Sequence, residues 1–249
     1  MTEVWILSGK EPGVNYRVQV YIPEQPPQSE RGYPVIYMMD ANYYFGLGTE
    51  VIRNQSHNLL KTGIDPAIVV GVALDAEDSV IRERRFYDFT PPAPVYTYPD
   101  KMKGKTTGKH GGAETFLNWL TDELQPRIIE NYPVQQDKQC LYGHSLSGLF
   151  ALYSMFKRPE AFQCYLAISP SIWWNEKHIY SFLSGAKDSK LFISVGEEEG
   201  FMVEDAMALY HRLPSTMDEN TSYYVADDEN HASVVPATMS RAFRYFFSC

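Results

Sequence analysis

The segment Lys138–Tyr153 reads KQCLYGHSLSGLFALY and decides the fold. Its first residues form a short apolar run that predicts a buried strand, and its last residues predict a helix. Ser145 lies at the sharp turn between the two. This arrangement is typical of the nucleophile elbow of serine hydrolases, in which a strained turn exposes the serine Oγ. The same turn directs the next backbone N–H, that of Leu146, toward a developing oxyanion.

The elbow departs from the usual pattern at one position. Glycine normally stands two residues after the serine, because neighbouring backbone crosses closely there. This chain has Ser147 at that position and places glycine one residue later, at Gly148. A Gly-x-Ser sequence also occurs by chance before ordinary helices. The flanking strand and helix favour a true elbow, with serine as a tolerated small replacement.

The bulk composition is that of one globular α/β domain. The chain has 249 residues and is 44% hydrophobic, so we predict a single domain over residues 1–249 with a sizeable core. Aromatic residues make up 14%, which predicts a ring-lined cleft as well as an aromatic core. The net charge of −9 argues against a nucleic-acid partner, because phosphates need clustered Lys and Arg.

The three cysteines, Cys140, Cys164 and Cys249, have no metal-ligand spacing. The first two lie on expected buried strands, so we predict reduced thiols that act as small apolar residues. No Cys-x-x-Cys or His-Glu-x-x-His motif occurs, and we expect neither a metal nor a cofactor.

The first residues, Met1–Trp5, lack a basic stretch followed by an apolar run. They predict no signal peptide, and no segment is long and apolar enough to predict a membrane span. We therefore expect a cytoplasmic protein with no membrane partner. A chain trimmed of a leader would look the same, so a periplasmic location stays open, and the sequence does not indicate an oligomeric state.

The apolar patterns predict a mostly parallel sheet. Residues 14–22 alternate between apolar and polar side chains, as in a half-buried strand, and residues 3–7 can pair with it as an antiparallel edge. The later runs are continuously apolar, as in strands covered on both faces. The expected strands are 3–7, 14–22, 35–39, 67–74, 140–142, 164–168, 191–195 and 223–225.

Helical spacing separates these strands, near 47–61, 113–131, 146–156, 204–213 and 233–247. A hairpin followed by alternating strands and helices predicts a doubly wound α/β sheet of the α/β-hydrolase type. Residues 75–112 break this alternation, because they are rich in Pro, Tyr, Gly and charge and have no clear period. We interpret this segment as a partly ordered, lid-like insertion, with 101–112 as its most mobile part.

The expected base and acid follow the serine in the chain. Six histidines are present, and only His231 lies between the last strand and the last helix, where the order Ser, acid, His places the base. The acid is expected just after strand 191–195, where three glutamates are adjacent. We favour Glu199, with Glu197 and then Asp205 as alternatives and Glu198 not distinguished, and a Ser–His dyad without an acid stays open.

The second oxyanion donor is expected in the loop that follows strand 35–39. A backbone N–H of Ala41 or Asn42 could pair with that of Leu146. Asp40 and Asn42 are also common turn residues, so turn formation alone could explain their presence.

Several segments together resemble one group, the esterase family of α/β-hydrolases that contains the siderophore (enterobactin and bacillibactin trilactone) esterases. The likeness extends from about the third strand to the C-terminus and is specific only as a set. The segments are YMMDAN (37–42), RRFYDFTP (84–91), the elbow, ISPSIWW (168–174), VGEEE (195–199) and NHASV (230–234).

The resemblance implies ester hydrolysis through an acyl-serine, with Ser145 as nucleophile and His231 as base. It further implies that Arg84 or Arg85 faces the substrate, where a guanidinium suits anionic or catecholate oxygens. It places Trp173 and Trp174 as a wall beside the elbow, at least one of them as a packing residue.

The chain departs from the family at Ser147 and Ala41, where members often have glycine. Both changes are expected to narrow the space around the oxyanion, which could alter substrate choice or lower activity.

The sequence therefore predicts a serine carboxylic-ester hydrolase acting on a small-molecule ester, with a siderophore-type trilactone or an aryl ester as the candidate substrates. Two alternatives use the same nucleophile, a thioesterase and an acyltransferase. A third is a non-catalytic binding protein on a degenerate hydrolase scaffold, which Ser147 and the uncertain acid leave open.

Overall fold

The computed structural model describes residues 1–97, 108–187 and 189–248. The described strands form one eight-stranded sheet in the order β1-β2-β4-β3-β5-β6-β7-β8. β1 and β2 form an antiparallel hairpin, β2 is antiparallel to β4, and all other neighbours are parallel. The strands are β1 (Thr2–Ser8), β2 (Asn15–Tyr21), β3 (Tyr33–Met39), β4 (Ile68–Leu74), β5 (Val134–His144), β6 (Cys164–Ile168), β7 (Lys190–Gly196) and β8 (Thr221–Ala226).

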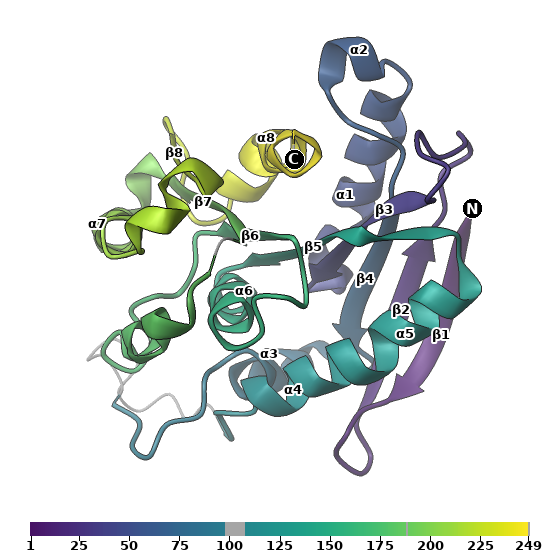
Figure 1. The fold of residues 1–249 in the computed structure, drawn as a ribbon. Coiled ribbons are helices and arrows are strands. Elements are labelled where there is room, and N and C mark those ends of the chain that lie inside the picture. Colours follow the sequence, from purple (N-terminus) through teal and green to yellow (C-terminus); the bar gives the residue numbers. More distant parts are fainter. Residues whose placement is uncertain (98–107, 188, 249) are drawn as a thin grey trace.

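This mostly parallel sheet with an antiparallel N-terminal hairpin confirms the predicted α/β-hydrolase fold. Its central strands are apolar throughout because helices cover both faces (Figure 1). One face carries α1 (Ala41–Ser56) and α8 (Val234–Phe247). The other carries α4 (Ala113–Trp119), α5 (Gln125–Asn131), α6 (Leu146–Lys157) and α7 (Phe201–Tyr210).

Two of the expected helices differ in detail from the structure. Helix α1 begins at Ala41, directly after β3, where a loop was expected. Asp40 adopts a left-handed conformation with φ 54° and ψ 40°, and its carbonyl accepts the amides of Tyr43 and Tyr44 to start the first turn. The long helix expected at 113–131 is divided by a π-helical segment, Leu120–Leu124, between α4 and α5.

The segment 75–112 is more regular at its start than its sequence suggested. Residues Asp78–Asp88 form the helix α3, whose buried residues are Ile81 and Asp88. So few buried positions leave hardly any apolar periodicity to detect. Most of 101–112, which was expected to be the mobile part, lies outside the described residues.

Smaller elements complete the chain. They are the short helix α2 (Leu59–Thr62) and the 3₁₀ segments η3 (His178–Gly185), η4 (Glu197–Glu199) and η5 (Ser215–Asn220). Cys140 and Cys164 lie opposite each other on β5 and β6, and both are buried, as predicted. Cys249 lies outside the described residues. Among the helices of the described segments, none has the length and apolar character that crossing a bilayer requires.

Backbone contacts at the turn between β5 and α6 explain where the elbow needs glycine. A Cβ placed on Gly143 would lie 2.1 Å from the carbonyl oxygen of Ser147, and one on Gly148 would lie 2.9 Å from that of Ile168. The close crossing therefore requires glycine at 143 and 148, and position 147 can carry a side chain.

We expect Gly143→Ala to destabilise the fold by about 3 kcal/mol or more, because the clash is with backbone that cannot rotate away. The matched control is Gly46→Ala in α1, where an added Cβ meets no atom within 4 Å. Alanine in a helix interior stabilises by about 0.5–1 kcal/mol relative to glycine. In urea unfolding, the free energy of unfolding should fall for Gly143→Ala and rise for Gly46→Ala. Equal changes in the two variants would contradict the close crossing at the elbow.

Candidate active site

Ser145 lies at the apex of the turn between β5 and α6, with φ 61° and ψ −116°. This conformation is rare for a residue with a side chain, so the surrounding contacts must hold it. The Ser145 amide donates to the Ile168 carbonyl at 3.0 Å, and the Ser145 carbonyl accepts from the amides of Leu149 and Ser171, both at 3.0 Å. The strained turn is therefore fixed to its own helix and to the end of β6.

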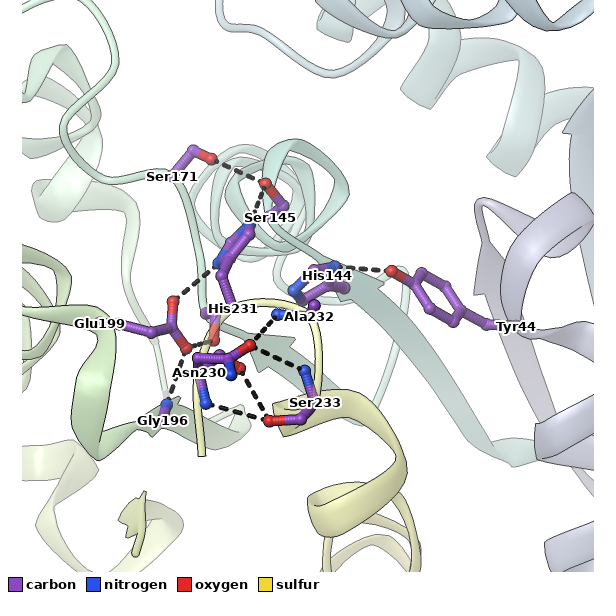
Figure 2. Close-up of polar contacts among 11 residues, drawn as sticks. Tyr44, His144, Ser145, Ser171, Gly196, Glu199, Asn230, His231, Ala232 and Ser233 are labelled. Carbon is purple, nitrogen blue, oxygen red and sulfur yellow. Dashed lines mark hydrogen bonds and ion pairs between the residues drawn. The ribbon is translucent and has the colours of Figure 1, made fainter. Parts of the chain in front are cut away.

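His231 reaches Ser145 from the loop between β8 and α8 (Figure 2). Its Nε2 lies 3.0 Å from the Ser145 Oγ, and its Nδ1 lies 2.7 Å from a carboxylate oxygen of Glu199. The Asn230 side chain holds this loop by accepting the Ala232 amide at 2.9 Å, as in an Asx-turn. The His231 side chain is 44% exposed, so the site is open to solvent on that side.

Glu199 is held by donors from three elements. Its side chain is only 1% exposed, and its second oxygen accepts the Gly196 amide at 2.7 Å and the Ser169 hydroxyl. Burial raises the pKa of Glu199, but the hydrogen bonds from His231, Ser169 and Gly196 outweigh it and bring the pKa below its ordinary value. The carboxylate is therefore ionised, so Nδ1 of His231 donates to it and Nε2 is left to accept the Ser145 proton.

The other candidate acids are engaged elsewhere. Glu197 accepts the Asp228 amide at 3.1 Å, and Glu198 is exposed. Asp205 is buried and forms an ion pair with Lys177 at 2.6 Å. Glu199, the favoured candidate, is the carboxylate in contact with His231.

Two serines for which the sequence predicted no role lie in this site. Ser171 Oγ is 3.3 Å from Ser145 Oγ, and Ser169 donates to Glu199. Both follow β6, in the segment 168–174 whose tryptophans alone were given a role. The available signal was their place at the carboxyl end of a strand next to β5, where ligand-contacting loops gather in parallel sheets.

The ring of His144, the residue before Ser145, contacts the ring of His231. The two ring centroids are 4.6 Å apart, and Tyr44 OH lies 2.9 Å from His144 Nδ1 (Figure 2). Burial, together with repulsion from the neighbouring His231, lowers the pKa of His144 to about 3. His144 therefore stays neutral beside the base at ordinary pH.

The expected oxyanion donors lie at the starts of two helices. Leu146 is the first residue of α6, and Ala41 and Asn42 are the first two of α1. The first amides of a helix have no carbonyl partner within it and carry partial positive charge, so they can bind an anion. A 2.6 Å hydrogen bond from the Ser147 hydroxyl to Asp40 brings these two helix ends together.

The side chains of Ser147 and Ala41 are both buried, and each has a defined contact. The Ser147 hydroxyl is fully buried and bonded to Asp40. The Ala41 methyl packs in the core between the sheet and α1, opposite Gly71.

Both arginines from the expected substrate-facing segment form ion pairs within the protein. Arg84 Nε bonds Asp88 at 2.8 Å, and Arg84 also contacts Glu11. Arg85 donates from Nε and Nη2 to the two oxygens of Asp40, at 2.6 and 2.9 Å. Each guanidinium thus already neutralises a carboxylate.

The two tryptophans differ in burial. Trp174 is 2% exposed and packs 5.5 Å from the Phe86 ring, so it is a packing residue. Trp173 is partly buried against it. Within the described residues, no group of His, Cys, Asp and Glu side chains is arranged to hold a metal ion.

Residues 9–238 match the model of an esterase family described as "Putative esterase". The chain is similar to the ferri-bacillibactin esterase BesA of Bacillus subtilis, with 35% identity over 98% of this chain and 89% of that protein. It is also similar to the siderophore enterobactin esterase of Emericella nidulans, with 36% identity over 73% of this chain and 63% of that protein.

Among solved structures, the BES protein from Bacillus cereus superposes with a TM-score of 0.88. The identity is 39%, and the superposition covers 98% of this chain and 95% of that one. The agreement extends over nearly the whole of both chains, so the similarity includes the segments that carry Ser145, Glu199 and His231.

We expect Glu199→Gln to remove a carboxylate that is stabilised in its ionised form. Because the pKa of Glu199 is lower in the folded state, its ionised carboxylate contributes to the free energy of unfolding. This contribution is fully present above the ordinary pKa of 4.5 and is lost as the pH falls through the lowered pKa. In urea unfolding, the variant should be less stable than the wild type by about 1–3 kcal/mol at neutral pH. The difference should shrink below about pH 4.

The matched control is Glu198→Gln, which makes the same change on the exposed neighbour. It should leave unfolding close to that of the wild type at every pH. A Glu199→Gln penalty that stays constant from neutral to acid pH would show that the charge is not what the three donors stabilise.

Proposed function

The chain belongs to the esterase family that includes siderophore esterases, and on this premise we propose that it is a serine carboxylic-ester hydrolase acting through an acyl-serine. The observation that carries the proposal is the continuous hydrogen-bond chain from Glu199 through His231 to Ser145, with contacts of 2.7 and 3.0 Å. A base oriented by a carboxylate and bonded to a serine hydroxyl is the arrangement that activates a weak nucleophile.

In the proposed first half-reaction, Ser145 Oγ attacks the ester carbonyl carbon while its proton passes to His231 Nε2. The carbonyl oxygen becomes an oxyanion that accepts hydrogen bonds from the Leu146 amide and from the Ala41 or Asn42 amide. One such donor lowers the barrier by about 3–4 kcal/mol. His231 then gives the proton to the leaving alkoxide, which departs as an alcohol and leaves an ester on Ser145.

In the second half-reaction, water takes the place of the alcohol. His231 removes a proton from the water as its oxygen attacks the acyl carbon. Collapse of the second tetrahedral intermediate breaks the bond to Ser145, which recovers its proton from His231. Glu199 keeps the same ring nitrogen protonated throughout and stabilises the imidazolium formed in each half.

For the substrate, we propose a siderophore-type trilactone or an aryl ester. The support is the set of similar proteins, whose names specify bacillibactin and enterobactin esters as their own substrates. Trp173 follows two residues after Ser171, which contacts Ser145, and offers a partly exposed aromatic surface for an aryl group. Arg84 and Arg85 are less suited to bind an anion than the sequence suggested, because carboxylates already pair with both.

Three sequence expectations stay predictions. They are the single domain over 1–249 with a lid-like insertion at 75–112, the cytoplasmic location, and the nature of the partner as a small-molecule ester alone. A thioesterase or an acyltransferase would use the same acyl-serine, and a binding protein would leave Ser145 unreactive.

A fluorophosphonate probe should label the wild-type chain at Ser145, because such probes react with an activated serine as an ester does. Ser145→Ala should abolish labelling, and His231→Ala should slow it by at least about 10³-fold. Mass spectrometry of the labelled peptide gives the site. His211→Ala, which removes an exposed histidine at the end of α7, should label at the wild-type rate.

A wild type that fails to label would favour the binding protein over the enzyme. Rapid labelling of His231→Ala would reject His231 as the base.

Hydrolysis of a substrate panel should distinguish the ester classes. The panel contains catecholate trilactones, p-nitrophenyl esters, aryl esters and thioesters matched to the esters. The trilactones are tested with and without bound iron, and every substrate is tested with and without an acceptor alcohol. We expect kcat/KM to be highest for a trilactone or an aryl ester. A thioester preference of about 10-fold or more, or transfer to the alcohol in place of hydrolysis, would replace the proposed activity with one of its alternatives.

A further inference from the structure

Asp40 is a buried carboxylate that accepts hydrogen bonds from two different parts of the site. Its side chain is 2% exposed. One oxygen accepts Arg85 Nε at 2.6 Å, and the other accepts both Arg85 Nη2 at 2.9 Å and the Ser147 hydroxyl at 2.6 Å. Asp40 precedes α1, Ser147 lies in the first turn of α6, and Arg85 lies on α3. One carboxylate therefore connects three helices around the proposed nucleophile.

The direction of the Ser147 hydrogen bond follows from counting its protons. The His144 amide donates to Ser147 Oγ at 2.9 Å, so the hydroxyl must donate elsewhere. It lies 2.6 Å from the Asp40 carboxylate and 2.9 Å from the His144 carbonyl. The charged and closer acceptor forms the stronger bond, so the proton points to Asp40.

Asp40 directly precedes α1, so its backbone conformation affects the direction of the Ala41 and Asn42 amides. Asp40 has a left-handed conformation, φ 54° and ψ 40°, which residues with a side chain adopt uncommonly. The hydrogen bonds on its side chain hold it there, and its carbonyl begins the first turn of α1. The direction of the Ala41 and Asn42 amides therefore depends on where the Asp40 carboxylate is held.

We propose that Ser147, Asp40 and Arg85 are positioning residues that align the second oxyanion donor, the amide of Ala41 or Asn42, with the Leu146 amide. Glycine, usual at position 147 of the elbow, could not form this link. Ser147 thus fixes the distance between the starts of α1 and α6. Arg85 contacts both oxygens of the Asp40 carboxylate, and its positive charge offsets the repulsion that a buried carboxylate would exert on the proposed oxyanion. The inference rests on the proposed function.

The test compares two buried serines of the same helix. Ser147→Ala removes the hydroxyl that bonds Asp40, and Ser154→Ala removes one that bonds only the Phe150 carbonyl within α6 at 2.8 Å. Both are fully buried, so each variant leaves a similar small void. With a p-nitrophenyl ester, Ser147→Ala should lower kcat on the order of 10- to 100-fold with little change in KM. Ser154→Ala should keep the wild-type kcat.

A transition-state readout separates positioning from general damage. A trifluoromethyl ketone, which forms a tetrahedral adduct with the serine, should lose affinity for Ser147→Ala by the same factor as kcat/KM. A substrate ester bound to a Ser145→Ala background should bind equally well with and without Ser147→Ala. Arg85→Lys keeps the positive charge but loses the two-point contact with Asp40. It should lower kcat and the ketone affinity by a smaller factor than Ser147→Ala does. It also tests the network if Ser147→Ala does not fold.

The pairing of Ser147 with Asp40 predicts non-additive effects. Asp40→Asn and Ser147→Ala together should cost less in kcat than the product of their separate losses, because both break one link. Unchanged kcat and ketone affinity in Ser147→Ala and in Arg85→Lys, with an active wild type, would overturn this inference alone. A wild type that neither hydrolyses esters nor labels would overturn the proposed function and this inference with it.

Discussion

The close crossing of backbone at the end of β5 is the contact on which the site depends. A side chain at Gly143 would overlap the carbonyl of Ser147, so the strand can turn into α6 only with glycine at that point. The same turn forces Ser145 into a conformation that few residues with a side chain adopt. The Ser145 amide and carbonyl form hydrogen bonds to α6 and to the end of β6, and these bonds offset the conformational strain. Ser145 could leave this conformation only if these backbone hydrogen bonds broke.

The parallel sheet places the other residues of the site at the same edge as Ser145. β5, β6, β7 and β8 are consecutive neighbours with the same direction, so the loops after them lie side by side. Ser145 follows the first of these strands, and Ser171, Glu199 and His231 follow the others in order. Residues separated by more than 80 positions in the chain thereby meet within hydrogen-bond distance. The chain order serine, acid, histidine is a consequence of the strand order.

The sequence predicted those features that a local pattern or the strand order determines. The apolar runs located the strands, and the single histidine between the last strand and the last helix gave His231. Glu199 could only be favoured among adjacent glutamates, because its selection depends on the 3₁₀ turn that carries its side chain back to the Gly196 amide. Helix α3 was missed because only two of its residues are buried. The family resemblance implied that Arg84 or Arg85 faces the substrate, and the sequence alone could not show that Asp40 lies opposite Arg85.

The charges around the proposed nucleophile divide into one set that titrates and one that does not. Glu199 faces His231, whose charge would appear and disappear during each half-reaction. Asp40 faces Arg85, whose guanidinium stays protonated, so the charge beside the proposed oxyanion donors would stay constant through turnover. His144 lies against His231 and is kept neutral by burial, since a second cation there would oppose the imidazolium. Proton transfer would therefore change the field on one side of the reacting carbon and leave the other side fixed. The groups on the oxyanion side would therefore not need to reorient when the negative charge develops. Hydrogen-bond donors lower the barrier most when they are already oriented in this way.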